Sequence, residues 1–246
     1  MTTGHDDPAR PPVYGIVGDG RMARHAAHYL ALDGLPVRRW SRREQTPLTE
    51  ALADATVVLV LITDAAIPGF VERHAAFLAA RTPVHFSGSL SLPDIAGMHP
   101  LSTFGPDLYD PRTYAAIPFV CDADGPGFPE VFPTLPNPHF VIPRTSKPLY
   151  HAGAVLAGNI STALWLKFFA ILEQLDIPRD AAYAYLERTC RNLIELGPQE
   201  VLTGPVVRKD RDTVRDNLRA LGNDPYGAVY GAFIAAVAPD LSEEKP

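Results

Sequence analysis

Short aliphatic runs alternate with amphipathic stretches along the first half of the chain. The run at 57–62 is entirely aliphatic, which is typical of a strand buried on both faces. Strands that alternate with helices in this way form βαβ units around a parallel sheet, so we expect an α/β fold with a doubly wound parallel sheet. The expected strands are 13–17, 36–40, 57–62 and 84–87, and the expected helices are 22–32, 48–53 and 67–80.

The middle of the chain, residues 92–142, has a different character. Short strand-like runs at 99–104, 115–121 and 139–142 are separated by a stretch rich in Pro and Gly at 125–138. This spacing predicts a compact segment, with little room for a full second half of the sheet.

Helical periodicity takes over from residue 147, and Gly197 and Gly222 are natural helix stops. We expect helices at 148–175, 179–196, 213–221 and 225–237. The predicted organisation is a disordered lead-in at 1–12, a parallel-sheet domain at 13–146 and an all-α domain at 147–246.

Composition narrows the class of protein. The chain has 246 residues, of which 46% are hydrophobic, and this is enough to bury a core. A net charge of −6 disfavours a nucleic-acid partner. Cys121 and Cys190 have no metal-ligand spacing, so we expect no metal site. The first residues lack the basic start and apolar run of a secretion signal, so we expect a cytoplasmic protein.

The longest apolar stretch, 152–172, approaches the length of a membrane span. It carries Asn159, Ser161, Thr162 and Lys167, which are costly or unusual in lipid. A helix buried in a helical domain or in a dimer core explains the stretch better than a membrane partner does.

A glycine fingerprint follows the first expected strand and opens the first expected helix. Gly18, Gly20 and Ala23 form G-x-G-x-x-A in "GIVGDGRMA". In a Rossmann domain the first glycine permits a tight turn, the second lets the backbone approach a pyrophosphate, and the small third residue allows close helix packing. Asp19, Arg21 and Met22 complete the turn. The motif predicts a dinucleotide site; the alternative is a turn with no ligand.

The end of the second strand indicates which dinucleotide would bind. NAD-binding domains place an acidic residue there to hold the ribose 2'-hydroxyl. Here Ser41, Arg42 and Arg43 follow the strand, and these side chains suit a 2'-phosphate, so NADP(H) is the expected cofactor. In the alternative reading the two arginines only solvate a loop.

Further polar residues follow the third and fourth expected strands. Ile62, Thr63 and Asp64 lie at the end of one strand, and Ser87 and Gly88 lie at the end of the next. Ligands of open α/β sheets bind outside the carboxyl ends of the strands, so we expect these residues near the nicotinamide end.

The candidate chemical centre is the start of the long helix. Lys147 opposes the dipole of the helix N-terminus, His151 lies one turn on, and Asn159 lies two turns further, near the same face. Either His151 or Lys147 could supply a proton as hydride arrives, and Lys147 could instead hold a substrate carboxylate. His99 is a second candidate. The alternative is a capped helix start with structural histidines. The acids Asp107, Asp110, Asp122 and Asp124 are interpreted as solvated turn residues.

Four motifs in order carry a resemblance to a known family. They are "GIVGDGRMA", "HFSGSL" with "HPLSTF", "KPLYHAGAVLAGN" and "LTGPVVRKD". The chain resembles short Rossmann-like candidate NADP oxidoreductases with an uncharacterised helical C-terminal domain, which are similar to pyrroline-5-carboxylate reductase and deazaflavin-dependent NADP reductases. The resemblance implies a C-terminal domain that forms a homodimer and a cleft near His99, Lys147, His151 and Asn159. It also implies that Thr203, Gly204, Pro205, Arg208 and Asp210 line that cleft.

Two functions are consistent with these features. The first is an NADPH-dependent oxidoreductase that reduces a small C=N or C=O substrate by hydride transfer. The second is an NADP(H)-binding sensor or assembly protein without turnover. The sequence does not identify the substrate.

Overall fold

The chain divides into two compact units. The computed structural model describes residues 11–241, so the expected lead-in at 1–12 lies outside the described residues except for its last two positions. The first unit is Met1–Asn159 and the second is Ile160–Pro246. The predicted boundary lies after residue 146, where a helix begins, whereas the two compact units divide after Asn159.

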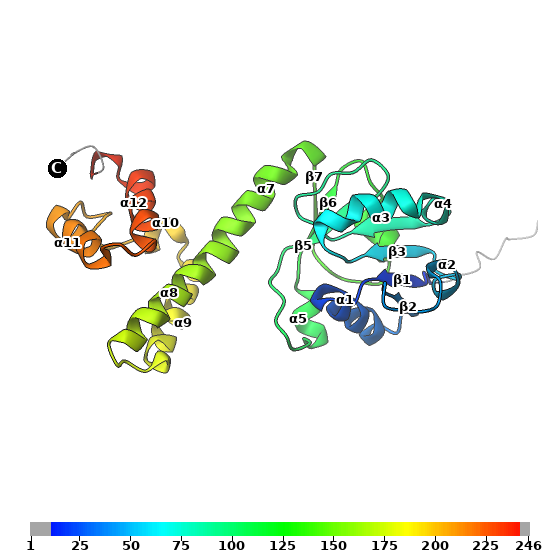
Figure 1. The fold of residues 1–246 in the computed structure, drawn as a ribbon, viewed down its shortest axis with the longest axis horizontal. Helices are drawn as coiled ribbons and strands as arrows, with labels where there is room; N and C mark the ends of the chain where they lie inside the picture. Colours follow the sequence, from blue (N-terminus) through cyan, green and yellow to red (C-terminus); the bar gives the residue numbers. More distant parts are fainter. Residues whose placement is uncertain (1–10, 242–246) are drawn as a thin grey trace, which may run out of the picture. The chain divides into compact units, whose positions relative to one another are not determined.

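A seven-stranded sheet forms the centre of the first unit (Figure 1). The strand order is β2-β1-β3-β4-β5-β6-β7, and all neighbours are parallel except the antiparallel pair β5 and β6. The predicted α/β class with a mostly parallel, Rossmann-type sheet is therefore confirmed. The strands are β1 (Tyr14–Val17), β2 (Val37–Trp40), β3 (Val57–Val60), β4 (Thr82–His85), β5 (Ala96–Pro100), β6 (Phe119–Asp122) and β7 (His139–Ile142).

Helices cover both faces of this sheet (Figure 1). Alternate residues of β3 face opposite cores, with Val57 and Leu59 in one and Val58 and Val60 in the other. All four are buried, as the aliphatic run predicts. The first core is closed by α1 (Arg21–Leu32) and α6 (Phe128–Val131), and the second by α2 (Leu48–Ala51), α3 (Ile67–Arg73) and α4 (Ala75–Leu78).

The expectation of an abbreviated second half of the sheet is wrong. Three strands, β5, β6 and β7, extend the sheet within residues 92–142, helped by the short helices α5 (Pro111–Ala115) and α6. Strands of four or five residues joined by Pro-rich turns leave little periodicity in the sequence. Their pairing comes from tertiary contacts such as Asn137, whose buried amide donates to the carbonyls of Tyr114 and Ile117.

Two further elements differ from the prediction. The helix expected at 67–80 breaks at His74, which ends α3 and precedes α4. The strand expected at 84–87 ends at His85, so that Ser87 and Gly88 lie beyond its carboxyl end. Both differences place polar residues at the same edge of the sheet.

The second unit is all-α, as predicted. Its small core contains Val206, Val214, Ile234 and Ala238. Its helices are α8 (Ser161–Gln174), α9 (Tyr183–Glu195), α10 (Pro198–Val201), α11 (Arg211–Leu221) and α12 (Tyr226–Val237). The expected helix at 148–175 consists of α7 (Lys147–Ala154), a π-helix (Val155–Ile160) and α8.

The stretch Arg144–Gln174 is long and apolar enough to span a membrane by length and composition, and it is the one such stretch within residues 11–241. Within the single chain it is not the buried helix that the sequence suggested, because only Lys147 of α7 and Leu172 of α8 are buried. Lys167, in the middle of α8, forms an ion pair with Asp224.

Candidate functional site

A pocket of about 660 Å³ opens at the carboxyl ends of β1 and β3. Because β2 lies on one side of β1 and β3 on the other, this is the point where the strand order reverses, the usual place for a ligand in such sheets. The residues that line it are Val17, Gly18, Asp19, Gly20, Arg21, Met22, Trp40, Ser41, Arg42, Leu61, Ile62, Thr63, Ala65, Ala66, Gly69, Phe70, Arg73 and His74.

The glycine fingerprint forms one wall of this pocket. Gly18 has φ of +125°, and a Cβ there would lie 2.3 Å from the carbonyl oxygen of Leu61. Gly20 is the N-cap of α1 and makes no side-chain cap, while a Cβ on it would meet no atom within 4 Å. Ala23 is fully buried beneath the turn, where a small residue lets α1 pack on the sheet. The first-turn amides of α1 therefore face open space next to a backbone that can be approached closely.

The two arginines after β2 have different surroundings. Arg42 lines the pocket beside the buried Ser41, whose hydroxyl accepts from the backbone N–H of Arg43 at 3.3 Å. The guanidinium of Arg43 instead pairs with Asp19 at 3.1 Å and does not line the pocket. Sequence reasoning treated Arg42 and Arg43 alike, but of these two only Arg42 has no carboxylate partner among residues 11–241.

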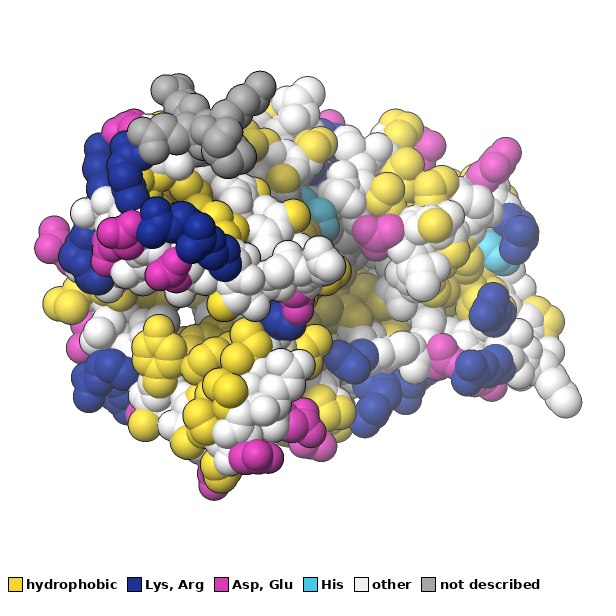
Figure 2. Space-filling view, turned by 60° about the vertical axis from the view of Figure 1, so that its left-hand side comes forward, with side chains coloured by type: hydrophobic (Ala, Val, Ile, Leu, Met, Phe, Trp, Pro, Cys, Tyr) yellow, Lys and Arg dark blue, Asp and Glu magenta, His cyan; other side chains and the backbone are white. Residues whose placement is uncertain are grey.

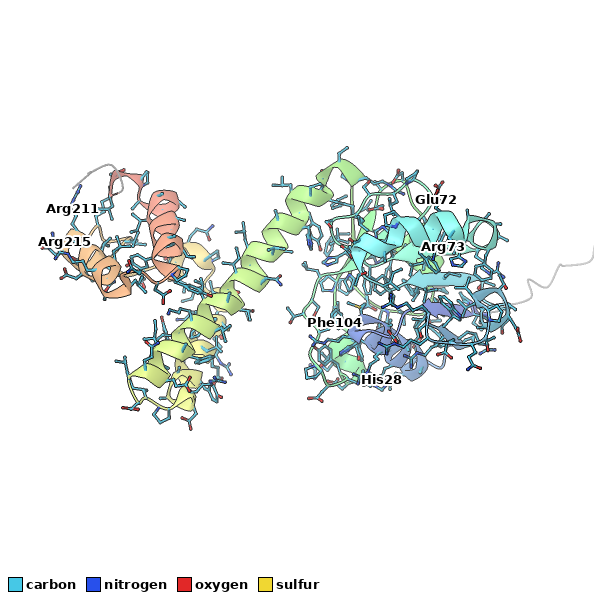
Figure 3. All side chains as sticks on the ribbon, in the orientation of Figure 1. His28, Glu72, Arg73, Phe104, Arg211 and Arg215 are labelled. Atoms are coloured by element: carbon cyan, nitrogen blue, oxygen red, sulfur yellow. The ribbon has the colours of Figure 1, made fainter. Side chains whose placement is uncertain are left out.

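The end of α3 contributes residues that the sequence analysis missed. Arg73 and His74 line the pocket, next to Phe70 and Gly69. The regular apolar pattern at 67–80 hides the helix break at His74, so the sequence carries no local signal for their position. Figure 3 shows Arg73 at the end of α3, together with its neighbour Glu72.

The residues expected near the nicotinamide end fall into two groups. Ile62 and Thr63 line the pocket. Asp64 and Ser87 lie next to each other, since the Ser87 hydroxyl donates to the Asp64 carboxylate at 2.6 Å. Asp64, Ser87 and Gly88 are not part of the pocket lining. Asp64 follows the pocket residue Thr63 in the chain, and Gly88 contacts a second cluster of polar residues.

This second cluster contains two histidines packed against Gly88. The rings of His99 and His151 have centroids 5.9 Å apart. A Cβ on Gly88 would lie 2.5 Å from Nδ1 of His151 and 3.0 Å from the His99 ring, so any other residue here would displace the His151 ring. Nδ1 of His151 is buried without a hydrogen-bond partner in the described part of the chain, whereas Nδ1 of His99 shares a hydrogen bond of 2.7 Å with the hydroxyl of Tyr150.

Burial makes two histidines of this region poor bases. Burial, followed by the nearby His151 and Lys147, lowers the pKa of His99 to about 4. Burial and Lys147 also lower the pKa of His85 to about 4. Both rings are therefore neutral at pH 7, and Nδ1 of His85 accepts from the backbone N–H of Ser87 at 3.1 Å.

Lys147 lies in a buried ion pair. Its Nζ is 2.9 Å from Oδ1 of Asp122, and both side chains are almost completely buried. Oδ2 of Asp122 accepts from the backbone N–H of Gly97 at 2.8 Å, and a Cβ on Gly97 would lie 2.1 Å from Nζ of Lys147. The interpretation of Asp122 as a solvated turn residue is wrong, because Asp122 is the last residue of β6 and points into this pair. Asp107, Asp110 and Asp124 are exposed.

Asn159 and the predicted C-terminal loop lie elsewhere. Asn159 is exposed and belongs to the π-helix after α7. Asn159 follows His151 by eight residues and lies inside the π-helix Val155–Ile160, so the regular spacing of an α-helix does not hold between them. Thr203, Gly204, Pro205, Arg208 and Asp210 belong to the second unit, where Asp210 caps α11 through the N–H of Thr213. Their placement at a cleft stays a prediction.

Comparisons with known sequences give two partial matches. A family model described only as a domain of unknown function (DUF2520) matches residues 124–236. A glycerol-3-phosphate dehydrogenase (NAD(P)+) from Synechococcus elongatus is 30% identical over 88 residues, and this match covers 36% of the present chain and 29% of the dehydrogenase.

Solved structures match nearly the whole chain. A candidate NADP oxidoreductase from Bacteroides fragilis is 21% identical with a TM-score of 0.73, covering 93% of this chain and 98% of the other. An imine reductase from Myxococcus stipitatus in complex with NADP+ is 14% identical with a TM-score of 0.61, covering 94% of each chain. Pyrroline carboxylate reductase from Plasmodium falciparum with NADP bound is 9% identical with a TM-score of 0.58, covering 94% and 97%. The predicted resemblance is confirmed at the level of the fold.

The two glycines of the fingerprint should respond differently to alanine. Gly18→Ala places a Cβ against the Leu61 carbonyl at a positive φ, so we expect a loss of about 1–3 kcal/mol from the backbone conformation, with the clash in addition. Gly20→Ala meets open space at an ordinary φ of −72°, so the free energy of unfolding should change by about 1 kcal/mol or less. Denaturant unfolding measures both values. Equal destabilisation by the two variants would contradict this account of the turn.

Proposed function

We propose that this protein is an NADP(H)-dependent oxidoreductase that reduces a small C=N or C=O substrate. The observation that carries the proposal is the pocket at the point where the strand order reverses. It joins a glycine turn, an uncapped helix N-terminus and Arg42, which has no carboxylate partner among the described residues. The NADP-bound structures of an imine reductase and a pyrroline carboxylate reductase with a similar fold support it.

The residues of the pocket fit the cofactor by charge and by space. Gly20 offers the room that a pyrophosphate needs, and the first-turn amides of α1 would hold it. Ser41 and Arg42 would hold the 2'-phosphate, which NADP(H) carries and NAD(H) lacks. When bound, NADPH supplies a hydride. Thr63 lines this pocket and is followed by Asp64, which accepts a hydrogen bond from Ser87. The next residue, Gly88, contacts the two histidines.

His151 is the best candidate for the proton donor. Its Nδ1 is the buried histidine nitrogen at Gly88 that has no hydrogen-bond partner among residues 11–241. A proton held at this atom would pass to a carbonyl oxygen or imine nitrogen as the carbon accepts hydride. His99 and Tyr150, joined by a hydrogen bond, would hold one side of the His151 ring. Asn159, about two helical turns beyond His151, would contact the substrate.

Lys147 fits a positioning role better than a catalytic one. Its ammonium group is buried and paired with Asp122, so contact with a substrate would require the pair to open. The pair instead fixes the first residue of α7 to the end of β6, one helical turn before His151. Lys147 would thereby set the distance between His151 and Gly88.

A second function, an NADP(H)-binding sensor without turnover, is favoured by one observation. Of the groups proposed for acid–base chemistry, Lys147 is held in an ion pair and the pKa of His99 is about 4. His151 is then the single group left to move a proton. A site with one acid and no relay is compatible with binding alone.

We also propose that two copies associate through the C-terminal helices. Hydrophobic side chains on these helices are left uncovered, and Figure 2 shows a continuous hydrophobic patch on the side that faces the viewer. Leu166 of α8 is 66% exposed and Ile194 of α9 is 84% exposed. Apolar surface of this kind is typical of an interface, and a second copy brings an identical patch.

Reduction of a substrate should depend on His151. A panel of small imines and keto acids is screened by the loss of NADPH absorbance, and His151→Asn is compared with wild type on the best substrate. We expect kcat to fall about 100-fold or more, because a positioned general acid contributes that much. His139→Asn, an exposed histidine on β7, serves as the control and should leave kcat unchanged. Equal rates for His151→Asn and wild type would contradict the proposed role. Tight NADPH binding without any turnover would favour the sensor.

The association of two copies is tested by light scattering after size-exclusion chromatography. We expect a mass of twice the 26.7 kDa chain for the wild type. Leu166→Glu places a charge in the proposed interface and should shift the mass toward a single chain, whereas Leu32→Glu on α1 should not. A wild-type protein that elutes with the mass of one chain would contradict the proposal.

A further inference from the structure

The end of α3 forms a wall of the pocket opposite the loop after β2. The helix stops at Arg73 because His74 leaves the helical conformation, with φ of −112° and ψ of 18°. The next helix starts at Ala75, so His74 sits at a corner between two helices. This corner directs Arg73 and His74 into the same pocket that Ser41 and Arg42 line.

Aromatic contacts tie this corner to the β2 loop. The Trp40 ring has its centroid 6.4 Å from both Phe70 and His74, and the latter two are 4.5 Å apart. The indole N–H of Trp40 donates to the Thr46 carbonyl at 3.0 Å, which closes the loop that carries Ser41 and Arg42. Burial, and then the charge of Arg73, lowers the pKa of His74, so its ring is neutral at pH 7. A flat, uncharged surface thus lies next to the arginines.

Two arginines reach this end of the pocket without an anionic partner. Within the described part of the chain, no carboxylate forms an ion pair with Arg42 or Arg73, although Arg43 close by is paired with Asp19. Glu72, the neighbour of Arg73, lines a different groove on the other side of α3 (Figure 3). Two unpaired cations that line one pocket repel each other, and a ligand with a doubly charged phosphate would relieve this repulsion.

We propose that Arg73 and His74 form a binding site for a 2'-phosphorylated adenosine together with Arg42 and Trp40. Arg73 pairs with the 2'-phosphate from the α3 side while Arg42 pairs with it from the β2 side. His74 and Trp40 present ring surfaces to the purine. This inference rests on the proposed binding of NADP(H) and adds the residue that distinguishes NADP(H) from NAD(H) on the α3 side.

Calorimetric titration with two small probes separates these contributions. Adenosine 2',5'-bisphosphate carries the 2'-phosphate, and 5'-AMP lacks it. Arg73→Ala should weaken binding of the bisphosphate about tenfold, as expected for the loss of a charge-assisted contact. It should change the affinity for 5'-AMP less than about twofold. Arg73→Lys keeps the charge but loses the planar guanidinium and should fall between the two. His74→Ala should weaken binding of both probes by similar factors, because it removes a contact with the purine that both probes carry.

Arg39→Ala is the matched control. Arg39 is an exposed arginine on β2 that does not line the pocket, so its removal changes the net charge equally without removing a proposed contact. Both probes should then bind as they do to the wild type. Circular dichroism confirms that each variant is folded.

The outcomes distinguish this inference from the proposed function. If Arg73→Ala leaves the bisphosphate affinity unchanged, or weakens both probes equally, the assignment of Arg73 to the 2'-phosphate is wrong. In that case a wild-type preference for the bisphosphate that Arg42→Ala removes would leave the proposed function intact. A wild-type protein that binds neither probe nor NADPH would overturn both.

Discussion

The close contact between the Gly18 turn and Leu61 is the constraint on which the pocket depends. The backbone N–H of Gly18 donates to the Trp40 carbonyl at 2.8 Å, and that of Leu61 donates to the Val17 carbonyl at 2.8 Å, so the ends of β1, β2 and β3 meet at one point. A side chain at Gly18 would separate them. With the three ends joined, the α1 N-terminus, the β2 loop and the segment after β3 surround one space. The glycine is therefore needed by the protein itself, whereas the space around Gly20 is available to a ligand.

A second constraint fixes the polar cluster beside that space. The pair between Lys147 and Asp122 is buried, and an unpaired charge in such a position would cost several kcal/mol. Gly97 supplies both the room for the ammonium group and an N–H for the carboxylate. Through this pair the start of α7 is held at the sheet, and His151 is brought against Gly88. The position of the cluster thus depends on this ion pair, beside which Nε of Arg144 lies 3.7 Å from Oδ2 of Asp122.

Local patterns predicted the parts of the molecule that local physics determines. The aliphatic run of β3, the glycine turn and the loop with Ser41 and Arg42 were recognised because their residues act through backbone conformation or through neighbours in sequence. The helical character of the C-terminal region followed from its periodicity in the same way. The meeting of His99, His151 and Gly88 was suggested only in part, since the sequence named each residue but gave no distances among them.

What the sequence did not reveal depends on contacts between distant segments. Asp122 ends β6, and its buried partner Lys147 lies beyond three further elements, so the residues next to Asp122 in the sequence indicated only a turn. Arg73 reaches the pocket only because α3 breaks at His74, and the apolar pattern continues across that break. In the sequence Arg43 looks equivalent to Arg42, but in the structure it pairs with Asp19. In each case a tertiary contact decides the role of a residue whose local pattern is uninformative.

The central claim is that the pocket at the reversal of strand order takes NADP(H), and side-by-side calorimetric titration of the wild-type protein with NADPH and NADH tests it most directly. The account predicts that NADPH binds at one site per chain and at least about tenfold more tightly than NADH, since only NADPH carries the phosphate that the unpaired arginines suit. Absence of binding by either nucleotide, or equal affinity for both, would contradict it.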